Sequence, residues 1–165
     1  MKKLLKMIGT VFAAVLVLVV VVLPITGFEP HGRTPGLWLT GEVVTTPVTD
    51  WSFVDAIETI KLQTSTQYLL PHSVTTYCVS ANGQLYITSL YRAGMTYPAG
   101  RSWNTDVARD PRVRLKIGDK VYDRTLVFVT DPAEYEAAYQ AKRKKYPRQK
   151  IPPGAKFMIF RAVEG

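Results

Sequence analysis

Cysteine and histidine are scarce in this chain of 165 residues, which contains only Cys78, His31 and His72. A single cysteine excludes an intrachain disulfide and a cluster of zinc-binding thiolates. Neither histidine lies in a G-x-S-x-G or H-E-x-x-H context, so the sequence predicts no hydrolytic triad, no metal site and no catalytic acid or base. Cys78 follows Tyr77 within an expected strand, where we expect a small buried thiol.

Acidic residues are also few, with 13 against 21 lysines and arginines, and the net charge is +8. Lys2, Lys3 and Lys6 carry three of these charges ahead of a long apolar run, which leaves +5 for the rest of the chain. Such a surplus is typical of a solvated cationic surface, or of a surface that meets an anionic cofactor or lipid headgroups. No nucleic-acid-binding motif accompanies it, so nucleic acid is not an expected partner.

Residues 1–27 read as an N-terminal membrane anchor or signal segment. From Met7 to Leu23 the only residues that are not apolar are Gly9 and Thr10. Seventeen helical residues cover roughly 25 Å, and the flanking Leu4, Leu5 and Ile25 extend the run enough to span a bilayer. The segment is therefore a candidate transmembrane helix, through which the chain would contact the membrane.

The three lysines before this run set its expected orientation. By the positive-inside rule the N-terminus is cytoplasmic and everything after Pro24 lies outside. We favour a single-pass anchor in the cytoplasmic (inner) membrane with an extracytoplasmic, periplasmic domain. The alternative is a signal peptide that is cleaved to release a secreted protein, although Ile25 is bulky for a small-x-small cleavage site.

Residues 28–36 contain the proline and glycine of a linker, and residues 37–165 are expected to form one folded domain. Within that domain, alternating or apolar runs predict strands, and Asn82-Gly83 predicts a tight hairpin between two of them. The expected strands cover 37–45, 59–65, 74–80, 84–90, 113–117, 121–130 and 156–163. Antiparallel hairpins without a βαβ rhythm favour a mainly β (α+β) barrel that is closed or split.

Two short helices interrupt these strands. Ser102 is a candidate N-cap for the first, which should end at Asp110 because Pro111 follows. Asp131 is the expected N-cap of the second, with Pro132 at N1 and Glu134 at N3. Four basic residues, Lys142 to Lys145, complement the dipole at the C-terminus of this second helix.

A group of polar and aromatic residues surrounds the first of these helices. Hydroxyls end a hairpin strand, arginines follow in a flexible loop, and the helix begins directly after the second arginine. Backbone amides at a helix start, together with arginine, suit a phosphate. A plainer interpretation packs the tryptophan in the core and leaves the arginines solvated. The residues are Thr88, Ser89, Arg92, Arg101, Trp103 and Asn104.

The stretch from Tyr86-Ile-Thr-Ser89 through Trp103-Asn104 to Asp110-Pro111 and Gly118 resembles the FMN-binding split-barrel superfamily, which includes pyridoxamine 5′-phosphate oxidase-like proteins and deazaflavin-dependent nitroreductases. The similarity extends from Leu37 to Val163. The resemblance implies a homodimer of six- to seven-stranded antiparallel split β-barrels with two short helices. It also implies FMN, or alternatively F420, near the subunit interface, where the cofactor performs the redox chemistry.

Carried over by position, Thr88 and Ser89 would contact the cofactor ring or phosphate, Arg92 and Arg101 would bind its phosphate, and Trp103 would form a wall of the pocket beside Asn104. Members of the nitroreductase branch usually carry a basic run ahead of the third expected strand. This chain has Tyr-Leu-Leu-Pro-His-Ser there, at 68–73. Only Lys61 and His72 could replace the missing charge.

Two functions follow from the sequence. The first is a membrane-anchored flavin- or deazaflavin-dependent oxidoreductase, similar to nitroreductases and quinone reductases, that acts on a small electron acceptor. The alternative is a split-barrel module without a cofactor or enzymatic activity that binds a small ligand or a partner at the membrane surface. The same fold can serve both, so the fold alone does not decide.

Overall fold

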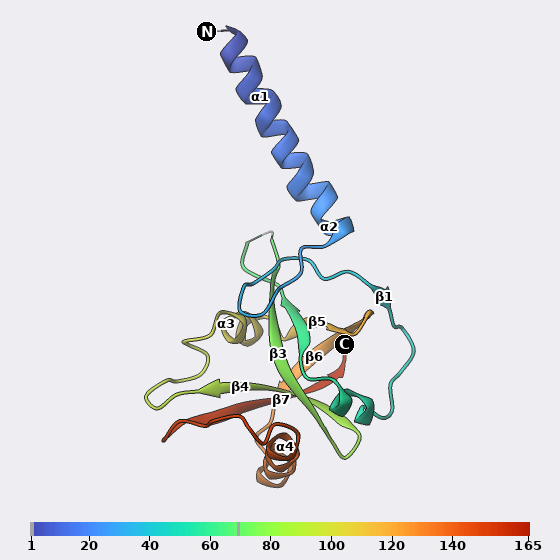
Figure 1. Ribbon diagram of the computed structural model, residues 1–165, viewed down its shortest axis with the longest axis vertical. Coiled ribbons are helices and arrows are strands. Elements are labelled where there is room, and N and C mark those ends of the chain that lie inside the picture. The colour runs from blue at the N-terminus through green and yellow to red at the C-terminus, as the bar shows by residue number, and fades with distance from the viewer. Residues whose placement is uncertain (1, 69) are drawn as a thin grey trace.

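The computed structural model describes residues 2–68 and 70–165, and Figure 1 shows a long N-terminal helix that projects away from a barrel. The helical rod comprises α1 (Lys2–Val17), the π-helical turn η1 (Leu18–Val22) and α2 (Leu23–Thr26). From Lys2 to Thr26 it is long and apolar enough to cross a membrane, with a mean hydropathy of 3.0 and no buried part. Both a membrane anchor and a signal segment have this length and composition.

Six antiparallel strands close into a barrel. They are β2 (Ile60–Thr64), β3 (His72–Ala81), β4 (Gln84–Tyr91), β5 (Arg112–Ile117), β6 (Lys120–Phe128) and β7 (Lys156–Glu164). Their order is β6-β5-β2-β3-β4-β7, and pairing of β6 with β7 closes the ring. A seventh strand, β1 (Glu42–Val43), adds to β6 in parallel. The predicted antiparallel barrel of six to seven strands is therefore confirmed.

The first expected strand, residues 37–45, is wrong for most of its length, because only β1 is a strand. Other groups satisfy the backbone of the residues before it. The Leu37 amide donates to the Phe28 carbonyl oxygen, and the Leu39 amide donates to Oε1 of Gln63 at 2.7 Å. Because the backbone amides of Leu37 and Leu39 already have these partners, they do not pair with a strand, and the segment does not join the sheet.

The turns between strands follow the sequence signals. Asn82 and Gly83 have φ of 51° and 75°, which is the left-handed pair that a two-residue hairpin requires, and they join β3 to β4. Gly118 has φ of 62° in the turn from β5 to β6. A 3-10 helix, η2 (Ser52–Ala56), lies ahead of β2.

Two short helices flank the barrel, as expected. In α3 (Ser102–Arg109) the N-cap is Arg101 rather than Ser102, and no side chain caps the first turn. The helix ends at Asp110 as predicted. In α4 (Pro132–Lys145) the N-cap prediction is confirmed, because Oδ1 of Asp131 accepts a hydrogen bond from the Glu134 amide at 2.7 Å.

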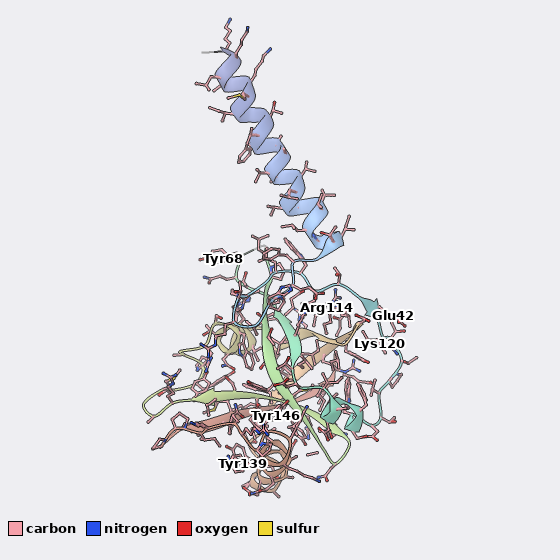
Figure 2. The ribbon with its side chains drawn as sticks, in the orientation of Figure 1. Glu42, Tyr68, Arg114, Lys120, Tyr139 and Tyr146 are labelled. Carbon is pink, nitrogen blue, oxygen red and sulfur yellow. The ribbon has the colours of Figure 1, made fainter. Side chains whose placement is uncertain are left out.

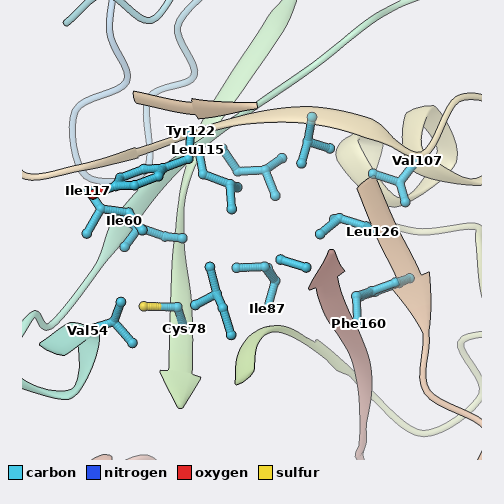
Figure 3. Close-up of a cluster of buried hydrophobic side chains, with 14 of the residues drawn as sticks. Val54, Ile60, Cys78, Ile87, Val107, Leu115, Ile117, Tyr122, Leu126 and Phe160 are labelled. Atoms are coloured by element: carbon cyan, nitrogen blue, oxygen red, sulfur yellow. The ribbon is translucent and has the colours of Figure 1, made fainter. Parts of the chain in front are cut away.

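Alternation along the strands produces two apolar layers. Inward-facing side chains fill the barrel, including Ile60, Ile87 and Leu115, which Figure 3 shows converging on one cluster. Cys78 belongs to this interior cluster, and burial raises the pKa of its thiol. Outward-facing residues of β3, β4 and β7, such as Tyr86, pack instead against α4. The outer faces of β3, β4 and β7 are therefore covered by α4, and the candidate site lies beside this packing.

Candidate functional site

A cavity of about 1020 Å³ lies over β2 and β3, beside the start of α3. We call it the outer cavity. One wall is the segment Pro30–Pro35, which begins a few residues after the N-terminal helix ends at Thr26 and folds back onto the barrel. The remaining lining residues are Glu58, Thr59, Lys61, Val74, Thr75, Thr76, Tyr77, Arg92, Arg101, Ser102 and Trp103.

A smaller cavity of about 180 Å³, the inner cavity, adjoins the outer one between β4, α3 and α4. The two share residues 75–77, Arg101 and Trp103. The inner cavity is otherwise lined by Thr88, Ser89, Leu90, Lys142, Gln149 and Phe157. A further cavity of about 580 Å³, lined by other parts of β2, β5 and β6, contains none of the residues predicted to bind a cofactor.

Most of the predicted site residues gather in the outer and inner cavities. Lys61, Arg92, Arg101 and Trp103 line the outer cavity, and Thr88 and Ser89 line the inner one. His72 and Asn104 line neither cavity. The fold therefore collects six of the eight positions, which come from four separate parts of the chain, although their role in binding a cofactor stays a prediction.

Thr88 and Ser89 are neighbours in β4, so their hydroxyls point to opposite faces of the sheet. Thr88 pairs with Tyr77 across the hairpin, on the side of the sheet that α4 covers. Ser89 accepts a hydrogen bond from Nδ2 of Asn104 at 2.8 Å, and both side chains are buried. Asn104 therefore fixes α3 against β4, whereas the Thr88 hydroxyl has no hydrogen-bond partner among the described residues.

His72 lies at the start of β3 and is directed toward α3. Its Nδ1 atom is 3.7 Å from Oδ2 of Asp106, and that oxygen also accepts a hydrogen bond from the Thr64 hydroxyl at 2.9 Å. This contact joins the middle of α3 to the barrel. The position of His72 fits a structural contact better than a contact with a ligand in the outer cavity.

Glu29 binds Lys61 and thereby holds the segment at 28–36 against the barrel. The carboxylate of Glu29 forms ion pairs with both Lys61 and Lys116. Burial alone would raise the pKa of Glu29, but the hydrogen bonds from the two lysines outweigh it and lower the pKa. Gly36 and Ser73 exchange backbone hydrogen bonds of 2.8 and 2.9 Å at the other end of the segment. Lys61 is therefore paired rather than free.

The outer cavity is electropositive. Its lining includes the basic side chains of Arg33, Lys61, Arg92 and Arg101, and only one acidic side chain, Glu58, among the residues that the structure describes there. Arg101 adopts an extended conformation and donates from Nη2 to the Leu90 carbonyl oxygen at 3.3 Å. The first turn of α3 contains no acidic residue. A helix N-terminus beside two exposed arginines favours the binding of an anion.

Lys142 was not identified from the sequence as a site residue, because it begins a basic run whose next two members, Arg143 and Lys144, are exposed. Its side chain is 1% exposed and lines the inner cavity. Nζ lies 5.0, 4.7 and 4.7 Å from the ring centroids of Tyr77, Tyr146 and Phe157. Burial lowers the pKa of Lys142 to about 8. Its spacing from the buried Ala138, one turn earlier, is the signal that would have placed it on the inner face.

Comparison with known proteins gives fold-level likenesses. No family model and no curated protein matches the sequence. Among solved structures, the conserved hypothetical protein Rv2991 from Mycobacterium tuberculosis has a TM-score of 0.50 and 16% identity, over 68% of this chain and 76% of that one. An F420-H2 dependent reductase has a TM-score of 0.45 and 21% identity, over 71% and 98% of the two chains. An FAD-binding protein from Mesorhizobium loti has a TM-score of 0.46 and 18% identity, over 67% and 82%.

The likeness to Rv2991 is one of fold alone, and in this chain β6 and β7 close a ring of six antiparallel strands. The resemblance seen in the sequence is therefore confirmed at the level of the fold. The chain has the split β-barrel fold that the sequence resemblance implied.

Proposed function

We propose that this chain binds a flavin-type cofactor, FMN or F420, in the outer cavity and serves as a membrane-anchored oxidoreductase. The observation that carries the proposal is the electropositive outer cavity, in which Arg92 and Arg101 flank the start of α3. Its volume of about 1020 Å³ lies at the upper end of the range for cofactor sites. The motif resemblance from Trp103 to Gly118 supports the same assignment.

The residues present fit the phosphate end of such a cofactor. Arg92 and Arg101 are both exposed and border one end of the cavity, where α3 begins. Guanidinium groups bind phosphate in a bidentate manner, and a helix N-terminus adds backbone donors and a favourable dipole. Lys61 also lines the cavity from β2, but its charge is already paired with Glu29, so the two arginines are the groups available to a phosphate.

The cofactor supplies the hydride or electron chemistry when it is bound, so the chain needs no catalytic acid or base of its own. The chain's residues hold and shield it. Trp103 is 6% exposed and lies where the two cavities meet, which suits it to limit the position of a flat ring. The segment 30–35 lines the other side of the outer cavity.

The short stretch of chain between the N-terminal helix and the outer cavity suggests which class of electron acceptor the protein uses. The segment that lines the outer cavity begins only a few residues after Thr26, where the helix ends. With the helix in the cytoplasmic membrane, the cavity lies close to the lipid surface. We therefore propose a quinone-like or nitroaromatic acceptor, with the domain on the extracytoplasmic side. We further propose a homodimer in which the second copy covers the open cavity.

A binding experiment on the full-length protein in detergent tests this function. FMN and F420 are titrated separately and their fluorescence is followed. We expect saturable binding of one of them, and the change Arg101→Ala should weaken it about tenfold or more, because a charge-assisted contact is lost. Arg109→Ala is the matched control, since Arg109 lies at the other end of α3 and lines neither cavity. Unchanged affinity in Arg101→Ala would refute the phosphate role of Arg101.

A further inference from the structure

The inner cavity contains two buried polar groups that lack partners. Nζ of Lys142 and the hydroxyl of Thr88 form no hydrogen bond with any described residue, and both side chains are more than nine-tenths buried. They come from different elements, α4 and β4, and line the same cavity. Buried donors without acceptors are costly, so their convergence on one cavity points to a ligand that accepts hydrogen bonds from both.

The aromatic rings around Lys142 hold its ammonium group but do not satisfy its N–H donors. Tyr77, Tyr146 and Phe157 have ring centroids within 5.0 Å of Nζ, where cation–π attraction is effective. Tyr146 lies between α4 and the barrel, where Figure 2 labels it, and its hydroxyl donates to the Cys78 carbonyl oxygen at 2.8 Å. That hydroxyl is therefore committed elsewhere. The ammonium group is fixed in place and left with unused donors.

The charges near Lys142 favour an anionic ligand with one negative charge. Lys145, one turn along α4, already donates to the carbonyl oxygens of Val54 and Cys78, each at 2.8 Å. Arg101 borders the cavity from the opposite side but is exposed to solvent. Among the described residues that line the inner cavity, Lys142 is therefore the one buried cation. A carboxylate neutralises it, whereas a phosphate dianion would leave an excess buried charge.

The walls of the cavity define the rest of the ligand. Its volume is about 180 Å³, which suits a small organic acid rather than a cofactor. Trp103, Tyr77 and Phe157 contribute aromatic surface, and Thr75 and Thr76 contribute polar surface on the side shared with the outer cavity. A flat, unsaturated body with a carboxylate at one end matches this distribution.

We propose that the inner cavity is a binding site for a small aromatic carboxylate, whose carboxylate group accepts hydrogen bonds from Nζ of Lys142 and from the Thr88 hydroxyl. The ligand's ring lies among Trp103, Tyr77 and Phe157. Because the two cavities adjoin, a carboxylate bound here lies next to whatever occupies the outer cavity. The site itself exists without a cofactor, and it goes beyond the function proposed above.

Calorimetric titration of the cofactor-free, full-length protein in detergent tests the site, with sodium benzoate as the probe. Benzamide, which has nearly the same shape but no charge, is the ligand control. Three variants accompany the wild type: Lys142→Met, Thr88→Val, and Lys144→Met as a matched control from the exposed part of the same helix. Inorganic phosphate is titrated in a separate arm.

We expect saturable benzoate binding by the wild type and much weaker binding of benzamide. Lys142→Met should lower the benzoate affinity about tenfold or more, Thr88→Val should lower it several-fold, and Lys144→Met should leave it unchanged. Absence of benzoate binding by the wild type, or equal binding by Lys142→Met, would overturn the proposal and leave Lys142 as a cation held by its rings alone. Phosphate that binds more tightly than benzoate in a Lys142-dependent manner would also overturn it, because the cavity would then receive a phosphate group.

Discussion

Replacing Lys142 by methionine should stabilise the protein, because the substitution removes a buried ammonium group that lacks hydrogen-bond acceptors. Burial lowers the pKa of Lys142 from the ordinary 10.5 to about 8. At roughly 1.4 kcal/mol for each unit of pKa, the folded state carries a penalty of about 3 kcal/mol for the charged form. The three surrounding rings offset part of it. Methionine keeps the length of the side chain and makes thioether contacts with the same rings, so we expect a gain of about 2 kcal/mol.

The stability gained by Lys142→Met should depend on pH, because it arises from removing a buried group that titrates. Below pH 8 the lysine is charged in both states, so the penalty is fully present. Between pH 8 and about 10.5 the folded protein has lost the proton that the unfolded chain still holds, and the wild type becomes more stable as pH rises. The difference in free energy of unfolding between Lys142→Met and the wild type should therefore be constant up to pH 7 and shrink above pH 8. Groups that do not interact with Lys142 titrate alike in both proteins and cancel, whereas Cys78 and Lys145 interact with it directly.

Urea unfolding of both full-length proteins in detergent, followed by near-ultraviolet circular dichroism at several pH values, measures this difference. Lys145→Met is the matched control. Nζ of Lys145 donates to two backbone carbonyl oxygens, so its loss should destabilise the protein by about 1 kcal/mol. If Lys142→Met is less stable than the wild type at pH 7, or if the difference does not change between pH 7 and 10, the reasoning about the buried ammonium group is refuted.

Three further substitutions test the local structure, each by urea unfolding of the full chain. Glu29→Gln should destabilise the protein by about 1 kcal/mol at pH 7, because Lys61 and Lys116 lose their carboxylate. The pKa of Glu29 is lowered, so this stabilisation is present above about pH 4.5 and lost in stronger acid, and a difference that persists at pH 2 would contradict the ion-pair explanation. Asn104→Ala should cost about 1–3 kcal/mol, since it removes the donor to the buried Ser89 hydroxyl; a neutral result would show that this contact does not fix α3. Asp131→Ala should lower the free energy of unfolding by about 1 kcal/mol, because α4 loses its N-cap. Glu136 does not cap the helix, so Glu136→Ala should not cause this loss.

The barrel was predictable because its signals are local. Alternation in residues 112–117 places Val113, Leu115 and Ile117 in the interior, and the structure buries all three. Asn82-Gly83 supplies the left-handed conformations of a tight turn, and Asp131 caps α4 as its residue type suggests. Each of these features depends on residues that are close in sequence, so an amino-acid pattern is sufficient to identify it.

Features that depend on distant residues were missed. Residues 37–45 have the composition of a strand, yet the side chain of Gln63 and the backbone of Phe28 take the hydrogen bonds that a sheet would need. Glu29 reaches Lys116 across 87 positions of sequence. In the sequence Lys142 is indistinguishable from its basic neighbours, and only the packing of β3 and β7 against α4 buries it. These contacts are set by tertiary packing, which overrides local preference.

In the candidate site too, some features follow from local sequence and others depend on distant contacts. Trp103 and the two arginines before it line the same cavity, while their role in binding a cofactor stays a prediction. The opposite wall, at 30–35, had the composition of a linker and gave no sign that it would fold back. Thr88 and Ser89 are adjacent in sequence and both line the inner cavity, but only the Ser89 hydroxyl is hydrogen-bonded to α3, through Asn104.

The visible absorption spectrum of the loaded protein shows whether the outer cavity binds a flavin-type cofactor, as we propose. Full-length protein is incubated with FMN or with F420, freed of unbound cofactor by gel filtration, and its spectrum is recorded against its protein concentration. We expect the protein fraction to retain the absorption band of one of the two cofactors, close to one molecule per chain. A protein fraction that emerges colourless from both incubations would contradict it.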